Sequence, residues 1–281
     1  MSEDGPVFEL DLPPLRESLA AAGLTARKSF GQHFLLDLNV TRKIARLAGP
    51  LAGRSVVEIG PGPGGLTRAL IGAGAHVVAV EKDARFIPLL QNLAAQAGGR
   101  LTIVEADALT LDPATLPASA AVIANLPYNV GTPLLVGWLT GAWRPTAMTL
   151  MFQKEVADRI VATPGGKDFG RLSVLAQALC ETRIVMDLPA RAFTPPPKVA
   201  SAVVSLTPRP DRPPDALIER LQVVTAAAFG QRRKMLRSSL KPLGGEALCL
   251  SVGVDPTDRA EDLTVAQFLA LAEATAPKNP A

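Results

Sequence analysis

The chain alternates short β-branched runs with longer helical stretches across residues 53–207, and this alternation constrains its fold more than any other feature. Buried strands separated by helices form a mostly parallel sheet with helices on both faces. The helical stretches include residues 66–74, 85–97 and 134–140. Seven runs read as strands: residues 55–59, 76–80, 101–104, 121–124, 148–152, 183–186 and 202–206. The sequence therefore predicts an α/β fold on a seven-stranded, doubly wound sheet.

A proline-dense segment, residues 208–214, ends this pattern. Its four prolines allow neither a helix nor a central strand to continue. Beyond it, residues 216–229, 233–240 and 265–274 have helical spacing. We therefore expect two domains: residues 1–208, an N-terminal segment with the sheet, and residues 209–281, a small helical domain.

Composition excludes several classes of protein. Of the 281 residues, 48% are hydrophobic and 20% are charged, which is too apolar for a disordered chain. No apolar run reaches the roughly 18–20 residues that span a bilayer, and residues 1–14 are acidic, unlike a secretory signal peptide. Two cysteines, Cys180 and Cys249, supply neither a disulfide framework nor a four-ligand zinc site. We expect a soluble, cytoplasmic protein with no metal.

Positive charge is concentrated in the C-terminal part of the chain, although the net charge is only +3. Residues 220–241 contain no acidic side chain and six basic ones: Arg220, Arg232, Arg233, Lys234, Arg237 and Lys241. Such a run is either a solvated helix face or a surface that binds phosphates. Charge alone does not decide between the two.

A glycine-rich turn follows the first expected strand. Gly60, Gly62 and Gly65 have the spacing G-x-G-x-x-G, which lets the backbone approach a ligand closely at the start of a helix. The second strand ends in Glu81, 21 residues after Gly60, where a carboxylate accepts hydrogen bonds from ribose hydroxyls. The glycine turn and Glu81 together fit either NAD or S-adenosylmethionine. Alternatively, the turn has a purely structural role and binds no ligand.

Two further strand ends carry polar groups. Asp107 follows the third strand, where it could accept a hydrogen bond from an adenine amine or serve only as a turn aspartate. The fourth strand ends in Asn125-Leu126-Pro127-Tyr128, the most specific signal in the chain. Alternatively, residues 125–128 form only a proline turn with a packed aromatic side chain and have no catalytic role.

The segment at residues 125–128 suits methylation of an exocyclic adenine amine. The lone pair of that nitrogen is delocalised into the ring, so the amine is a weak nucleophile. The Asn125 side-chain oxygen and the Leu126 carbonyl could accept hydrogen bonds from the two N–H groups of this amine. These hydrogen bonds would favour a tetrahedral nitrogen. Pro127 would hold the turn, and Tyr128 offers a face for stacking the base.

The chain is similar to a known family. Asn-Leu-Pro-Tyr looks like the motif of S-adenosylmethionine-dependent amino-methyltransferases, and the wider chain resembles the KsgA/RsmA family of ribosomal RNA adenine dimethyltransferases over about residues 27–240. Residues 28–37, 192–201 and 229–237 carry the rest of the resemblance. It implies a Rossmann-like, S-adenosylmethionine-dependent methyltransferase sheet with a small C-terminal helical domain.

The resemblance also implies roles for single residues. His33 stands where the family usually has asparagine, and Phe193 would be the second aromatic wall of the adenine pocket or, alternatively, a core residue. The cofactor contacts are Gln32, His33, Leu35, Gly60, Gly62, Glu81, Lys82, Asp107, Ala108 and Asn125. The catalytic residues are Asn125, Leu126, Pro127, Tyr128 and Phe193, and the RNA contacts are Lys198, Arg232, Arg233, Lys234 and Arg237.

The resemblance implies an enzyme that dimethylates two adjacent adenosines in the 3′-terminal hairpin loop of small-subunit (16S) ribosomal RNA. Its partner would be the immature 30S subunit, and the enzyme would be a monomer. Three alternatives stay open: a large-subunit rRNA methyltransferase that confers antibiotic resistance, a ribosome assembly factor whose main role is binding, and an NAD-dependent dehydrogenase. The last leaves residues 125–128 unexplained.

Overall fold

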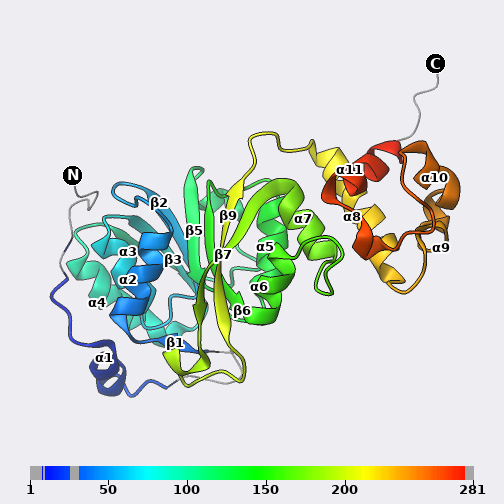
Figure 1. The fold of residues 1–281 in the computed structure, drawn as a ribbon. Helices are drawn as coiled ribbons and strands as arrows, with labels where there is room; N and C mark the ends of the chain where they lie inside the picture. The colour runs from blue at the N-terminus through cyan, green and yellow to red at the C-terminus, as the bar shows by residue number, and fades with distance from the viewer. Residues whose placement is uncertain (1–7, 9, 26–31, 276–281) are drawn as a thin grey trace, which may run out of the picture. The chain divides into compact units, whose positions relative to one another are not determined.

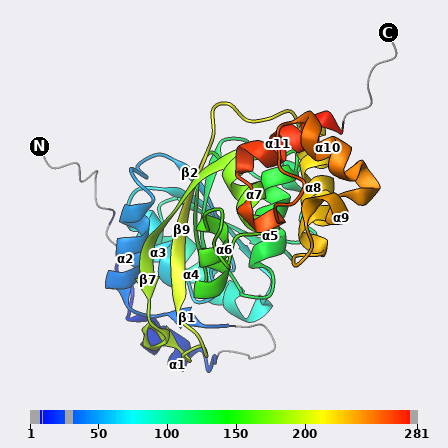
Figure 2. The ribbon, with the colours of Figure 1, turned by 45° about the vertical axis from the view of Figure 1, so that its right-hand side comes forward.

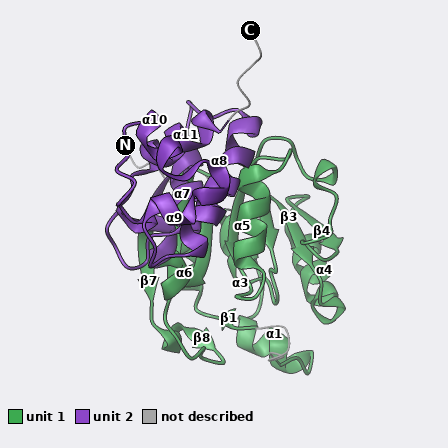
Figure 3. Cartoon of the chain, turned by 90° about the vertical axis from the view of Figure 1, so that its right-hand side faces the viewer, with its two compact units in different colours: residues 1–157, 183–206 green, residues 158–182, 207–281 purple. Residues whose placement is uncertain are grey.

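The computed structural model describes residues 8, 10–25 and 32–275. The chain forms two compact units, residues 1–157 with 183–206 and residues 158–182 with 207–281 (Figure 3). The first unit is built on the sheet, and the second is helical. Among the described residues, no helix is long and apolar enough to cross a membrane.

The first unit contains the seven-stranded sheet that the sequence predicts. Its order is β4-β3-β2-β5-β6-β9-β7 (Figure 1). The bounds are β2 Ser55–Ile59, β3 His76–Glu81, β4 Leu101–Glu105, β5 Ala120–Asn125, β6 Met148–Gln153, β7 Cys180–Leu188 and β9 Ser201–Pro208. The neighbours from β4 to β6 pair in parallel, whereas β9 is antiparallel to β6. The expected α/β fold is confirmed.

The strand order places a ligand crevice at a defined point of the sheet. From β2 the chain moves outward through β3 to β4, and then returns to add β5 on the other side of β2. In open α/β sheets, ligands bind at the carboxyl ends of the strands where the order reverses. The glycine turn after β2 and the residues after β5 therefore meet at this switch point.

Helices cover both faces of this sheet. Figures 1 and 2 show α2 and α3 on one side and α5 on the other. The helices are α1 Leu15–Ala21, α2 Leu38–Leu47, α3 Gly65–Gly72, α4 Ile87–Gln96, α5 Gly131–Thr140 and α6 Lys154–Val161. The start of α2 is set by Asp37, whose side chain accepts a hydrogen bond from Asn39 N at 2.8 Å and caps the helix.

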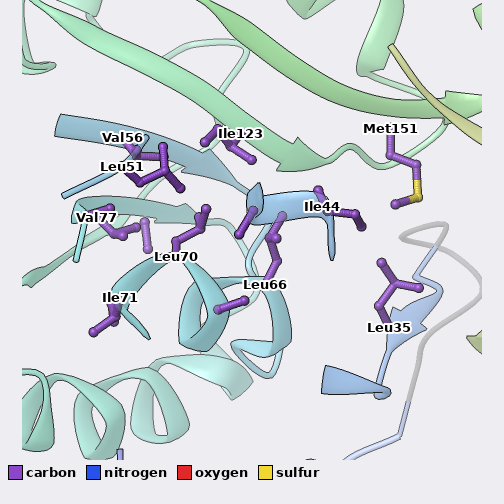
Figure 4. Close-up of a cluster of buried hydrophobic side chains, with 14 of the residues drawn as sticks. Leu35, Ile44, Leu51, Val56, Leu66, Leu70, Ile71, Val77, Ile123 and Met151 are labelled. Atoms are coloured by element: carbon purple, nitrogen blue, oxygen red, sulfur yellow. The ribbon is translucent and has the colours of Figure 1, made fainter. Parts of the chain in front are cut away.

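The main apolar cluster packs strand side chains against α3 (Figure 4). Val56 and Val77 from neighbouring strands are 0% and 1% exposed, and Leu70 of α3 is fully buried. Burying each such side chain stabilises the fold by about 1.5–3 kcal/mol. This rigid layer fixes the strand ends that carry the candidate site.

A second, two-stranded sheet pairs β1 (Phe34–Leu35) with β8 (Phe193–Thr194) in antiparallel orientation. Leu35 is opposite Phe193, although the two residues are far apart in the sequence. Two-residue strands have no readable periodicity, so the sequence does not predict this pairing. It ties residues 32–35 to the loop that contains the triple proline.

The second unit contains α7 Arg171–Leu179, α8 Asp215–Gly230, α9 Leu236–Ser239, α10 Gly245–Ser251 and α11 Val265–Ala274. Short 3₁₀ turns in the chain span Ala84–Phe86, Pro113–Thr115, Ala190–Ala192, Lys241–Leu243 and Ala260–Asp262. The expected helix over residues 233–240 is wrong in its first half, because residues 231–233 form a turn and Met235 is extended and bridges to Arg259. That long-range bridge overrides the local helical spacing.

The division into units differs in part from the expected domains. The break after residue 206 lies next to the expected boundary, whereas residues 158–182 group with the C-terminal helices. Within that unit, α7 packs against α8 and α11. Arg209 donates from its backbone N to Leu179 O at 2.9 Å and from Nε to Gln177 O at 3.0 Å. A single boundary could not describe this unit because the chain enters it twice.

Candidate functional site

A cavity of about 310 Å³ lies at the carboxyl ends of the strands in the first unit. Its lining comes from the segment before α2, the glycine turn and the ends of β3, β4 and β5. Of the expected site residues, it brings together Gln32, His33, Leu35, Gly60, Gly62, Glu81, Lys82, Asp107, Ala108, Asn125, Leu126, Pro127 and Tyr128. Residues 28–31 of the first family-like segment lie outside the described residues.

The glycine turn closes one wall of the cavity. Gly62 has a φ of +54°, which side chains rarely adopt, and a Cβ there would lie 3.3 Å from Cε1 of Phe34. Its backbone N instead donates to Glu81 Oε2 at 2.9 Å. Glycine is thus required both by the backbone conformation and by the space.

Glu81 is the buried carboxylate at the end of β3, 6% exposed. Besides the bond from Gly62, its Oε1 accepts a hydrogen bond from Asp83 N at 2.8 Å. Burial raises the pKa of Glu81, and the two backbone donors oppose that shift. Each carboxylate oxygen keeps a further lone pair, so the group can also accept hydroxyl hydrogen bonds from a ribose.

Glu58 is a cavity residue to which the sequence analysis assigned no role. It is 2% exposed, and among the described residues its Oε2 has no hydrogen-bond partner. Burial raises the pKa of Glu58 to about 8, with a smaller contribution in the same direction from Glu81. Because this pKa lies near 8, Glu58 is mostly protonated and neutral near pH 7. The only sequence signal was its place two residues before the first glycine of the turn.

Asp107 is both a turn residue and an ion-pair partner. Lys82 Nζ lies 2.8 Å from Asp107 Oδ2, and Leu109 N donates to Oδ1 at 3.0 Å. The bond from Lys82 is the main cause of the lowered pKa of Asp107. Because the Asp107 side chain is 31% exposed at the cavity, it stays accessible to an amine donor.

An ion pair anchors the segment over the cavity. Gln32 Nε2 donates to Asp83 Oδ2 at 2.9 Å, and Arg85 Nε donates to Asp83 Oδ1 at 2.8 Å. Arg85 is the main reason why the pKa of Asp83 falls to about 2. Asp83 thus stays ionised at neutral pH and links residues 32–35 to the end of β3.

The residues after β5 are held by partners outside their own strand. Asn125 Nδ2 donates to His33 O at 3.2 Å, which leaves Oδ1 of the same carboxamide as an acceptor. The Tyr128 hydroxyl lies 2.7 Å from Ser201 Oγ, and burial raises the pKa of Tyr128. The site therefore presents an oriented amide oxygen beside a fixed aromatic ring.

Phe193 is buried, as the alternative of a core residue expects. Its side chain is 3% exposed, belongs to the main apolar cluster and is absent from the cavity lining. The antiparallel pairing of Phe193 with Leu35 directs it into the core. The ring beside Tyr128 is instead that of His33.

The expected RNA-binding residues fall into two groups. Lys198, Arg233, Lys234 and Arg237 are exposed. Arg232 is committed to the second unit: its Nε donates to Glu261 Oε2 at 2.6 Å, and Nη2 donates to Lys167 O and Phe169 O. These bonds hold the loop before α7, while the Arg232 side chain is still 44% exposed.

These groups fit S-adenosylmethionine. The glycine cradle and Glu81 suit a ribose-bearing ligand, and Asp107 suits an adenine amine. NAD shares the glycine turn and the carboxylate, but a dehydrogenase leaves the Asn125 carboxamide and the Tyr128 ring at the end of β5 unexplained. The residues that would hold the cofactor are therefore Glu81, Asp107 and the glycine turn.

Comparisons with known proteins identify the family of the chain. A family model described as ribosomal RNA adenine dimethylase matches residues 23–276. Ribosomal RNA small subunit methyltransferase A of Phenylobacterium zucineum is 65% identical over 265 residues, 94% of this chain and 93% of that protein. A dimethyladenosine transferase from Plasmodium falciparum has a TM-score of 0.72 at 25% identity, over 85% of this chain and 96% of that one. The 23S rRNA methyltransferase ErmE has a TM-score of 0.68 at 28% identity, over 86% and 98%. The chain therefore belongs to the ribosomal RNA adenine dimethylase family.

Proposed function

We propose that this chain dimethylates the N6 amines of two adjacent adenosines in the 3′-terminal hairpin loop of small-subunit rRNA. The observation that carries the proposal is the Asn125 carboxamide, which lines the cavity and donates through Nδ2 to His33 O, so that its oxygen is left as the acceptor of the group. The names and high identity of the small-subunit relatives support this choice of substrate.

S-adenosylmethionine supplies a methyl group activated by its sulfonium. The side-chain oxygen of Asn125 and the carbonyl of Leu126 accept hydrogen bonds from the two N–H groups of the target amine. These bonds would localise the nitrogen lone pair and aim it at the methyl carbon, with S-adenosylhomocysteine as the leaving group. The methylated nitrogen would be acidic and lose its proton to water, so the chain needs no general base. In a second round the one remaining N–H would bond to one of the two oxygens, and transfer would give dimethyladenosine.

The target base must leave its stack to reach the cavity. A single-stranded hairpin loop lowers the energy of that step. Tyr128, half-buried and tied to Ser201, offers a face on which the extruded adenine stacks. The cavity thus selects an unpaired adenine by stacking and by acceptors for its amine.

Exposed cations would hold the rRNA backbone through its phosphates. The candidates are Lys198, Arg233, Lys234 and Arg237. We infer that the substrate is the immature 30S subunit, and that the chain acts as a monomer in the cytoplasm. Methylation would then accompany small-subunit maturation, and a binding role in assembly is compatible with the same exposed cations.

The deciding experiment is transfer of labelled methyl groups to small subunits from a methylation-deficient strain, followed by nucleoside mass spectrometry. Dimethyladenosine at two adjacent positions is the expected product. Label only in large-subunit RNA would replace this proposal with the activity named for ErmE. Tight binding of NADH in a parallel titration would favour a dehydrogenase. If a catalytically inactive variant restored subunit assembly in a deletion strain, binding would be the larger role.

A further inference from the structure

His33 contacts three parts of the candidate site. Its imidazole stacks on Tyr128, with ring centroids 5.5 Å apart and an interplanar angle of 30°. Its Nδ1 lies 2.8 Å from Pro195 O, and its own backbone oxygen accepts the bond from Asn125 Nδ2. One residue therefore joins the Asn-Leu-Pro-Tyr segment to the triple-proline loop.

The bond to Pro195 fixes the imidazole in its plane. A backbone carbonyl only accepts hydrogen bonds, so Nδ1 of His33 is the donor. The ring is thus held by a hydrogen bond at one edge and by Tyr128 on one face. It is a fixed aromatic surface and not a freely rotating side chain.

The Tyr128 ring is held at its other end as well. Its hydroxyl lies 2.7 Å from the Oγ of Ser201, a fully buried residue at the start of β9. Because the hydroxyl end and one ring face both have partners, the orientation of this ring is set before any RNA arrives.

The stacking distance decides which face of Tyr128 can receive a base. A planar base needs about 3.5 Å on each side, or roughly 7 Å between two flanking rings. The centroids of His33 and Tyr128 are only 5.5 Å apart, so a base does not fit between them. A base that stacks on Tyr128 therefore takes the face of that ring turned away from His33.

We propose that His33 is a positioning residue whose imidazole, tethered to Pro195, sets the angle of the Tyr128 ring on which the target adenine stacks. This role differs from the cofactor contact implied by the resemblance. It rests on the proposed function, since it takes adenine as the stacked base. The backbone bond to Asn125 survives substitution of the side chain, so the ring can be tested alone.

The first test is spectroscopic and needs no activity. Tyr128 is the only tyrosine in the chain, so fluorotyrosine labelling gives one fluorine NMR resonance. His33→Asn removes the neighbouring ring and should shift that resonance, and His33→Phe should move it less. The matched control is His76→Asn, at the only other histidine, which is exposed at the start of β3 and should cause no shift. An unshifted resonance in His33→Asn would overturn the proposal.

The second test separates RNA from cofactor. His33→Asn should raise the KM for small subunits roughly three- to tenfold, the value of one aromatic contact. Calorimetric affinity for S-adenosylmethionine should not change, and His33→Phe should recover part of the KM. Weaker cofactor binding with an unchanged KM would make His33 a cofactor contact instead. A wild-type chain that leaves small subunits unmethylated would refute the proposed function, while the fluorine shift still tests the ring contact.

Discussion

The cofactor cavity and the basic turn of residues 231–237 use polar side chains in opposite ways. At the cavity, the functional groups are held by the protein itself. Asn125 is bound by a backbone carbonyl, Tyr128 by a buried serine hydroxyl and Glu81 by two backbone amides. These dipoles are in place before a ligand arrives.

In the basic turn, the backbone is fixed and the cations are exposed. Leu236 N donates to Asp258 O at 2.8 Å, and Arg237 N donates to Pro256 O at 2.9 Å. The side chains of Arg233, Lys234 and Arg237 are exposed to solvent. Fixed dipoles lower a reaction barrier because they need no reorganisation, whereas exposed cations supply salt-dependent affinity. A change at the cavity should therefore alter rate, and a change at the turn should alter binding.

The largest expected effect is that of Asn125→Ala. Removing the oriented acceptor should lower kcat by about a thousandfold, equivalent to about 4 kcal/mol. Methyl transfer to small subunits measures this loss, and thermal unfolding should stay close to that of the wild type. The control is Asn92→Ala, an exposed asparagine on α4, which should leave both unchanged. Normal turnover by Asn125→Ala would disprove the proposed mechanism.

Glu58→Gln tests how strongly the cavity disfavours charge. The folded chain holds a proton on Glu58 up to a pKa of about 8, whereas the unfolded chain releases it near the ordinary value of 4.5. Wild-type stability should therefore fall as the pH rises between these values. Compared with the difference at pH 4, the variant should gain roughly 4 kcal/mol at pH 8, since each pKa unit is worth about 1.4 kcal/mol. Denaturant unfolding at both pH values measures this, and an equal difference at each would contradict a neutral buried acid.

The double variant Arg233→Ala/Lys234→Ala tests whether the basic turn of residues 231–237 supplies RNA affinity. If both side chains bind phosphates, the double variant should bind rRNA roughly tenfold more weakly, with a salt dependence reduced by about one to two ions. Its kcat at saturating RNA should match the wild type, since neither residue lines the cavity. Binding isotherms at several salt concentrations give the slope. A lower kcat with an unchanged slope would count against a binding role.

Arg232→Ala should have the smallest effect, and on stability rather than on binding. Its partly exposed ion pair with Glu261 and its two carbonyl bonds suggest a loss of about 1 kcal/mol. The salt dependence of RNA binding should stay at its wild-type value. A reduced slope with unchanged thermal stability would return Arg232 to the RNA contacts.

The sequence predicts the sheet and most of the cavity because their signals are local. Each strand is a β-branched run, and parallel strands end at the same edge of a sheet, so Gly60, Glu81 and Asn125 had to converge. The glycine turn is also a local signal, because its backbone conformation depends on the glycines themselves and not on a distant partner.

The sequence is least informative where a distant partner decides. The burial of Phe193 depends on its pairing with Leu35, and the ion pair of Arg232 depends on Glu261. The turn at residues 231–233 follows from a bridge between Met235 and Arg259, which helical spacing cannot reveal. Ser201 escaped notice for the same reason, since its role is visible only beside Tyr128.

The glycine turn and the Asn-Leu-Pro-Tyr segment also share a wall. A Cβ on Gly60 would lie 3.4 Å from Pro127 Cγ, so the two segments are in near contact. Any shift of the turn caused by one ligand therefore reaches the segment that receives the other. Linked equilibria make such an effect reciprocal, so cofactor and adenine should alter each other's dissociation constants by the same factor. Equal cofactor affinities with and without adenosine would show two independent sites; unequal ones would show that the two sites are energetically coupled.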